Sequence, residues 1–134
     1  KLAKLYSQQF YAQIPKILSS KGVFITQATS SYFSPNAFAS VFNTIKSSNS
    51  SREVVAFQTN IPSFGEWGFV LSAPNSNAIL SQKLPQELAY QNQERLSYTV
   101  KKSVSNLPKT EISTLLTPKI VQYYENDMKQ WRYY

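Results

Sequence analysis

Residues 54–72, VVAFQTNIPSFGEWGFVLS, decide the fold of this 134-residue chain. The apolar, β-branched run at residues 54–57 predicts a strand that continues to about Asn60. Pro62-Ser63-Phe64-Gly65 has the composition of a tight turn, and residues 67–72 predict a second strand. Because the connection is so short, we expect the two strands to pair antiparallel.

Upstream of this hairpin the sequence predicts a helix, a strand and a second helix. Ser7 is a candidate cap for the first helix, and Pro15 should interrupt it. Residues 23–28 are short and largely apolar, as in a strand buried on both faces. Ser34-Pro35 is a strong start for the second helix. Its predicted buried side consists of Ala37, Phe38, Val41, Phe42 and Ile45. The order helix, strand, helix, strand, strand predicts an α/β layer that ends in a hairpin.

Beyond Pro74 the composition changes. Residues 74–93 are rich in Asn, Gln and Ser and are expected to form loops. The spacing of apolar residues predicts a helix over 94–105, and residues 107–116 are expected to be irregular. Thr117-Pro118 predicts the start of a last helix, which reaches about Trp131.

Composition excludes several kinds of chemistry. The chain has no cysteine and no histidine, so thiol nucleophiles, disulfides, histidine bases and the usual zinc sites are excluded. Apolar runs such as residues 23–25 and 69–71 are far shorter than the roughly 18 residues that a membrane helix requires. The chain begins with Lys1 and runs directly into a helical pattern, from which we expect it to begin inside a larger protein.

The net charge of +7 is unevenly distributed and leaves an alternative function open. All charged residues before Glu53 are basic, whereas the signs nearly cancel after it. A small basic module that binds nucleic acid or an anionic membrane surface is therefore the alternative reading. The early lysines are scattered, and most tyrosines lie in other segments, which counts against such a module.

Several segments, in this order, resemble the spermidine synthase family of aminopropyltransferases. Residues 5–11, LYSQQFY, resemble the helix that follows the family's catalytic loop, and residues 22–27, GVFITQ, resemble its fifth strand. Residues 60–70, NIPSFGEWGFV, resemble its substrate-side loop and final strand. Residues 29–35, 62–69 and 115–131 are closest to a bacterial branch in which a membrane-embedded region precedes the synthase domain.

The resemblance implies a fold class, a domain division and a reaction. The fold is α/β: the C-terminal portion of a Rossmann-like methyltransferase sheet, strands five to seven with the last pair antiparallel, followed by a mostly helical tail. Residues 1–73 would be the C-terminal half of the aminopropyltransferase domain, and residues 74–134 a loop and helical extension. The family moves an aminopropyl group from decarboxylated S-adenosylmethionine, its co-substrate, to an amine such as putrescine.

The reaction requires groups that this sequence lacks. The attacking ammonium needs a carboxylate to hold and deprotonate it, and the nucleoside needs a glycine-rich turn with an acidic residue. The three glycines form no such array, and no acid precedes Glu53. By resemblance, these groups belong to a missing N-terminal half of the catalytic domain, so we expect no catalytic residue and no cofactor site in this chain. The chain alone should be inactive.

One wall of the amine pocket is the site that the resemblance leaves to this chain. Gln27 matches a family glutamine that lies near the amine, although a strand-end glutamine satisfied by backbone is the alternative. Phe64 stands where many members carry tyrosine, so only apolar contact would remain, and packing in the core is the alternative. Trp67 could line the pocket or fill the core.

The strand over 23–28 should have a further neighbour in the whole fold. An open apolar edge is a template for pairing, so we expect dimerisation, exchange of segments, or coverage by the first helix. The expected partners are a small polyamine substrate and a second copy of the chain, without nucleic acid. The expected location is cytoplasmic, with a possible inner-membrane anchor in the full-length protein.

Overall fold

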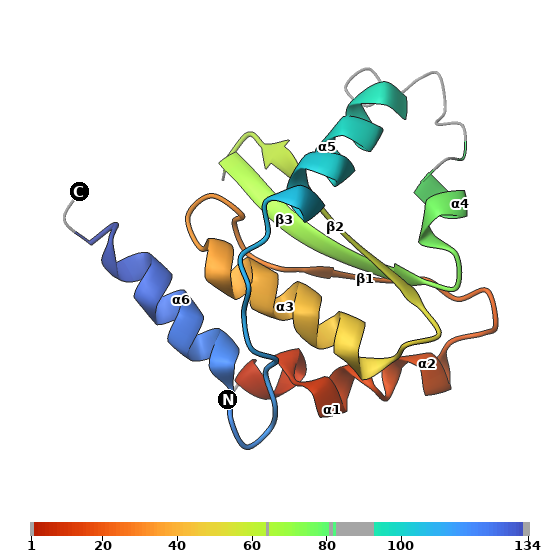
Figure 1. The fold of residues 1–134 in the computed structure, drawn as a ribbon, viewed down its shortest axis with the longest axis horizontal. Helices are drawn as coiled ribbons and strands as arrows, with labels where there is room; N and C mark the ends of the chain where they lie inside the picture. The colour runs from red at the N-terminus through yellow and green to blue at the C-terminus, as the bar shows by residue number, and fades with distance from the viewer. Residues whose placement is uncertain (1, 64, 81, 83–92, 133–134) are drawn as a thin grey trace.

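The computed structural model describes residues 2–63, 65–80, 82 and 93–132. Within these residues, the N-terminal half contains a 3-10 helix η1 and three α-helices around the first strand, and two further strands and three helices follow (Figure 1). In chain order, the elements are η1 (Leu2–Tyr6), α1 (Gln8–Tyr11), α2 (Ile14–Ile17), β1 (Phe24–Gln27), α3 (Pro35–Ser48), β2 (Glu53–Ile61), β3 (Gly65–Ala73), α4 (Ser76–Leu80), α5 (Gln93–Ser105) and α6 (Lys119–Lys129).

The three strands form one sheet in the order β1-β3-β2, in which β3 is antiparallel to both neighbours. The predicted antiparallel hairpin is therefore confirmed. Its last strand lies between the other two, so β1 and β2 run in the same direction without touching. Phe69 of β3 lies opposite Gln27 of β1 on one side and Phe57 of β2 on the other.

Local signals in the sequence explain how the first helices and the hairpin turn form. The Ser7 side chain accepts a hydrogen bond from the backbone N–H of Phe10 (3.2 Å), so the predicted cap of α1 is confirmed. Pro15 lies in the first turn of α2, where its missing N–H costs nothing, and the chain breaks between α1 and α2. Gly65 closes the hairpin opposite Ile61 with a φ of +75°, a conformation that side chains rarely adopt.

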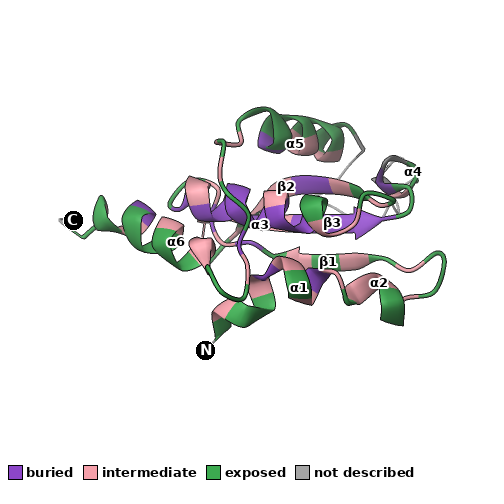
Figure 2. Cartoon of the chain, turned by 60° about the horizontal axis from the view of Figure 1, so that its bottom comes forward, coloured by how far each residue is buried: buried purple, intermediate pink, exposed green. Residues whose placement is uncertain are grey.

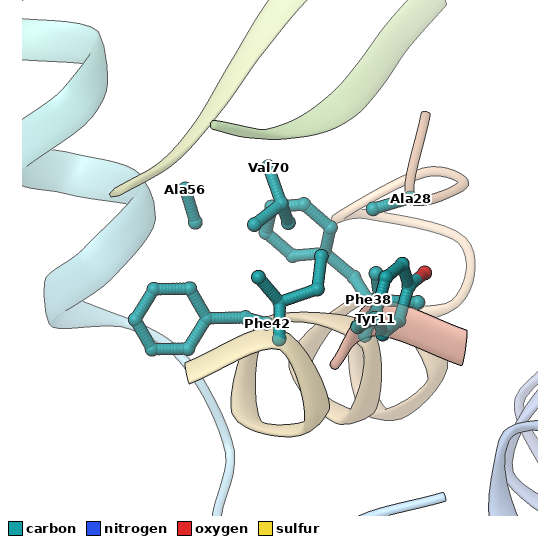
Figure 3. Packing of buried hydrophobic residues seen from close by; sticks show 8 residues of the cluster. Tyr11, Ala28, Phe38, Phe42, Ala56 and Val70 are labelled. Atoms are coloured by element: carbon teal, nitrogen blue, oxygen red, sulfur yellow. The ribbon is translucent and has the colours of Figure 1, made fainter. Parts of the chain in front are cut away.

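Helix α3 covers one face of the sheet and forms the core (Figures 2 and 3). The predicted side of this helix is buried as expected, since Ala37, Phe38, Val41, Phe42 and Ile45 are all less than a tenth exposed. Figure 3 shows Phe38 and Phe42 pointing toward Ala56 and Val70 of the sheet. A fully buried phenylalanine contributes about 1.5–3 kcal/mol, so this contact is a main source of stability.

The tail after β3 returns to the α3 layer. Helix α5 packs against β2, and α6 packs against α3 (Figure 1). Both helices lie close to their predicted positions, and residues 107–116 between them are irregular as expected. The region 74–93 contains the short helix α4, where the sequence predicted only loop, and most of its remainder lies outside the described residues.

Strand β1 has one free edge in the described part of the chain, because it is terminal in the sheet. Its burial differs from the prediction: Val23 is 43% and Ile25 is 52% exposed, so only the face toward α1 and α3 is covered. The prediction of burial on both faces is therefore wrong for this chain. Helix α1 contributes Tyr11, whose ring meets Phe24 at 5.9 Å between centroids, to the covered face.

Candidate functional site

Gln27 lies at the end of β1, where the sheet continues for two more residues. The backbone N–H of Ala28 donates to the Gly68 oxygen (2.9 Å), and the N–H of Gly68 donates to the Thr29 oxygen (2.7 Å). Thr29 then turns the chain with a φ of 64°, which is unusual for a β-branched residue. Such a conformation costs roughly 1–3 kcal/mol and persists only when the surroundings impose it. The end of β1 is thus held in a fixed, strained geometry.

Position 68 of β3 requires glycine, because a side chain at this position would collide with its neighbours. A Cβ at Gly68 would lie 2.4 Å from the Phe38 ring and 2.8 Å from the Thr29 oxygen. The glycine therefore faces α3, and the neighbouring residues Trp67 and Phe69 face the opposite side of the sheet.

Two of the three predicted site residues share this opposite face. Gln27 is exposed and pairs directly with Phe69, and paired residues of antiparallel strands project to the same side. Trp67 is half-buried and lies opposite Thr59 of β2. It is two residues nearer the hairpin turn than Phe69. Phe64 lies outside the described residues. Gln27 and Trp67 are therefore on one face, but neither lines the hollows described below.

The face that carries Gln27 is otherwise aromatic. The rings of Phe57 and Phe69 stack with 5.6 Å between centroids and an interplanar angle of 20°. An amine beside Gln27 would meet one amide group and an apolar surface. This arrangement can contact the carbon chain of a substrate, but it supplies no base.

The loop after β1 is fixed by its own hydroxyl groups and by the tail. The Thr29 and Ser34 hydroxyls are hydrogen-bonded to each other (2.9 Å), and the N–H of Ser34 donates to the Ser30 oxygen (3.0 Å). Trp131, just beyond α6, donates from Nε1 to the Phe33 oxygen (2.9 Å), and the two rings are 5.0 Å apart. The end of the tail therefore holds the loop that borders the candidate site.

A polar trough lies on the α3 side of the sheet, between the hairpin and α5. It consists of two hollows of about 200 and about 270 Å³, which share Gln58, Glu66 and Lys102. We call their combined space the α5 trough. The first hollow is also lined by Ser31, Tyr32, Pro35, Phe38, Ser103, Asn106, Leu107 and Pro108, and the second by Thr59, Asn60, Arg95, Tyr98 and Thr99. Ser31 donates a hydrogen bond to Gln58 and so links the loop after β1 to the trough.

An apolar groove of about 560 Å³ lies between η1, α3 and α6 and reaches the end of β1 at Thr29. Its lining is mostly aliphatic and aromatic: Leu2, Ala3, Tyr6, Ala28, Ala37, Val41, Ile120, Val121 and Tyr124, with Glu125 at its margin.

The groups with shifted pKa values lie away from the end of β1. Burial raises the pKa of Tyr11, and the neighbouring Tyr6 adds to the effect. A hydrogen bond to Glu111 raises the pKa of Lys119, with which it forms an ion pair (2.8 Å). Across the described ranges, no group of three or more acidic residues could hold a metal ion. In those same ranges, none of the helices has the length and apolar character needed to cross a bilayer.

The fold and the sequence place this chain in a known family. A family model described as the spermine/spermidine synthase domain matches residues 1–84, more than half of the chain. The chain therefore belongs to the spermine/spermidine synthase family, and the resemblance of its segments to that family is confirmed.

Individual relatives agree with this assignment. The chain is 34% identical over 125 residues to polyamine aminopropyltransferase 2 of Aquifex aeolicus, a match that covers 91% of the chain and 24% of the relative. It is 33% identical over 142 residues to polyamine aminopropyltransferase 1 of Streptomyces coelicolor, which covers 99% of the chain and 25% of the relative. The chain thus spans about a quarter of the length of these curated relatives.

Solved structures confirm the fold class. Spermidine synthase from Thermotoga maritima matches 75% of the chain with a TM-score of 0.59, at 17% identity and over 39% of its own length. A spermidine synthase in complex with the transition state analogue AdoDATO matches the same share with a TM-score of 0.57, at 16% identity and over 40% of its length. The fold is the α/β, Rossmann-like fold of this family.

Sequence reasoning missed the residues that organise the trough and the tail. Ser103 and Asp127 lie in segments for which the sequence predicts only a helix, and both are buried in the structure. A polar residue on the inner side of an amphipathic helix was the available signal for each. Glu66, beside the hairpin turn, lies on the opposite face of the sheet from Gln27.

Proposed function

We propose that this chain is the C-terminal part of a polyamine aminopropyltransferase and contributes one wall of its amine pocket. The single observation that carries the proposal is the family match over residues 1–84 together with relatives four times as long that are named for this activity. The same match disfavours the alternative of a small basic module for nucleic acid or membranes.

The reaction explains why the chain needs further polypeptide. A neutral amine nitrogen attacks the carbon next to the sulfonium of decarboxylated S-adenosylmethionine, a C–N bond forms, the C–S bond breaks and a neutral thioether leaves. A carboxylate must accept the proton that the ammonium loses. Glu66 faces away from Gln27, and Asp127 is engaged at the start of α3. The base and the nucleoside site are therefore assigned to the missing half.

Gln27, Phe64 and Trp67 are the proposed contacts with the amine. Gln27 offers an amide oxygen to an ammonium, and the aromatic side chains cover the carbon chain. The fixed backbone at Thr29 and Gly68 supports this wall, because it holds the end of β1 against β3.

The missing half is also the proposed partner for the free edge of β1. The exposed side chains of Val23 and Ile25 would be covered by a helix or loop from that half, and its strand would pair with the edge. Without it, a second copy of the chain is the expected partner. If the isolated chain is a monomer by light scattering and its β1 amides exchange rapidly with solvent, pairing with a second copy is contradicted.

A chimera tests the function directly. The chain replaces the matching region of the Aquifex aeolicus relative, and aminopropyl transfer to putrescine is measured for the chimera and for the isolated chain. We expect an active chimera and an inactive isolated chain. Activity in the isolated chain would show that the essential carboxylates are present after all, and a folded but inactive chimera would contradict the assignment to aminopropyl transfer.

A further inference from the structure

The side chain of Ser103 is an unexplained feature of the α5 trough. It is only 5% exposed and lines the first hollow, and its hydroxyl has no hydrogen-bond partner among the described residues. A buried, unpaired hydroxyl destabilises a fold unless something satisfies it. The buried hydroxyl of Tyr11 is also unpaired, but its hollow is only about 10 Å³ and is too small for a ligand. Ser103 instead borders about 200 Å³ of open space.

Helix α5 turns part of its polar side toward this space. Thr99, Lys102 and Ser103 line the trough, whereas Val104 is 42% exposed to solvent. The half-buried Leu96 and Val100 lie on the same inner side of the helix. This inner side is therefore mixed, and Thr99, Lys102 and Ser103 are the residues that place polar groups around the hollows.

The trough contains one acidic and two basic side chains, Glu66, Lys102 and Arg95. Glu66 of β3 and Lys102 of α5 line both hollows, and no ion pair joins them in the described structure. A carboxylate attracts an ammonium, and a lysine ammonium attracts a carboxylate. Phe38 and Leu107 add an apolar surface beside these groups. The trough thus matches a molecule that carries both charges on a short carbon chain.

We propose that the α5 trough binds a small zwitterion with a primary ammonium and a carboxylate. The ammonium lies at Glu66, the carboxylate lies at Lys102, and the Ser103 hydroxyl donates to the carboxylate. The site goes beyond the proposed aminopropyl transfer, because it lies on the opposite face of the sheet from Gln27 and Trp67.

Three probes with the same four-carbon skeleton test the charge pattern. Binding of γ-aminobutyrate, butyrate and putrescine to the full chain is measured by calorimetry. We expect γ-aminobutyrate to bind about tenfold more tightly than either other probe, since each of those loses one charge pairing. Because Gln27 is a proposed contact for putrescine, this probe is also measured with Gln27→Leu. Equal or tighter binding of putrescine that persists in Gln27→Leu, or no binding of γ-aminobutyrate, would overturn the proposal.

Variants locate the site on the protein. Glu66→Gln should bind γ-aminobutyrate no more tightly than butyrate. Lys102→Gln should bind γ-aminobutyrate no more tightly than putrescine. Ser103→Ala should weaken γ-aminobutyrate binding roughly threefold to tenfold. Lys101→Gln is the matched control, because Lys101 is an exposed neighbour that does not line the trough. Glu66 is exposed, so we expect Glu66→Gln to keep the fold even if Ser103→Ala fails to fold. Unchanged affinity of Glu66→Gln for γ-aminobutyrate would overturn the proposal. The chimera assay for aminopropyl transfer is independent of these measurements.

Discussion

Asp127 caps helix α3 through Asn36, a residue 91 positions earlier in the chain. One carboxylate oxygen accepts the backbone N–H of Asn36 (2.9 Å), and the other accepts its side-chain amide (2.6 Å). The first oxygen also accepts the N–H of Ala37 (3.0 Å). Ser34 makes no side-chain hydrogen bond to this helix end, so the tail supplies the anionic cap that the helix start itself lacks.

Replacing Asp127 should therefore destabilise the whole fold rather than α6 alone. We expect Asp127→Ala to lower the free energy of unfolding by about 1–3 kcal/mol, because the buried N–H of Ala37 and the partly buried N–H of Asn36 lose their partner. Asp127→Asn should have a smaller effect, since its one amide oxygen can still accept. Urea unfolding of each variant gives the comparison, with Glu125→Gln on the same helix as the control. Similar losses in Asp127→Ala and the control would show that the cap contributes nothing.

The contact of Trp131 with Phe33 should keep the loop after β1 in one conformation. Trp131→Phe keeps an aromatic ring against Phe33 but removes the indole N–H that donates to the Phe33 oxygen. We expect a stability loss of about 0.5–1.5 kcal/mol. Amide exchange should become faster in residues 31–34, whereas exchange in β3 should follow the global loss only. Uniform acceleration across the chain would contradict a local role for this contact.

Gly68 and Gly65 should respond differently to the same substitution. Gly68→Ala introduces a Cβ against Phe38 and the Thr29 oxygen, so we expect a loss of roughly 1–3 kcal/mol or more from overpacking. Gly65→Ala meets open space but keeps a φ of +75°, which costs roughly 1 kcal/mol. The free energy of unfolding is measured for both. Phe38→Leu should reduce the cost of Gly68→Ala in a double-mutant cycle and leave the cost of Gly65→Ala unchanged.

Tyr11 should make the fold sensitive to alkali. Burial raises the pKa of Tyr11 in the folded state above its ordinary value of 10.0, so the unfolded state loses this proton first as the pH rises. Its contribution to stability is complete below pH 10.0 and is lost as the pH rises toward the raised folded pKa, at up to about 1.4 kcal/mol per pH unit.

Two variants separate Tyr11 from the other tyrosines. Tyr11→Phe removes a buried hydroxyl without a partner, so its stability at neutral pH should be unchanged or higher and its loss above pH 10.0 shallower. Tyr98→Phe, at a position 66% exposed, should keep the original slope. The free energy of unfolding is measured against pH for both variants. If it falls equally steeply above pH 10.0 in both, Tyr11 is not the cause of the sensitivity to alkali.

The features that sequence predicted correctly are those with local causes. The cap at Ser7, the start of α3 at Pro35 and the turn closed by Gly65 each depend on residues within a few positions. The placement of β3 between β1 and β2 depends on which edges meet in three dimensions, and the strand sequences are compatible with either order. The cap supplied by Asp127 and the hollow beside Ser103 likewise arise from segments far apart in the chain. For the candidate site, Gln27 and Trp67 were assigned to one pocket through resemblance alone, and their common face follows from the register of the three strands.

Gln27 should affect binding of the amine more than the chemical step. In the active chimera, we expect Gln27→Leu to raise KM for putrescine about tenfold with a smaller change in kcat, because the lost amide contacts the amine both before and during the reaction. Gln13→Leu, an exposed glutamine on the N-terminal helices, is the matched control and should leave both constants unchanged. Phe64→Tyr should lower KM, since a hydroxyl becomes available to the ammonium. A fall in kcat at constant KM in Gln27→Leu would instead place this residue at the reacting atoms, and unchanged constants would exclude the strand end from the pocket.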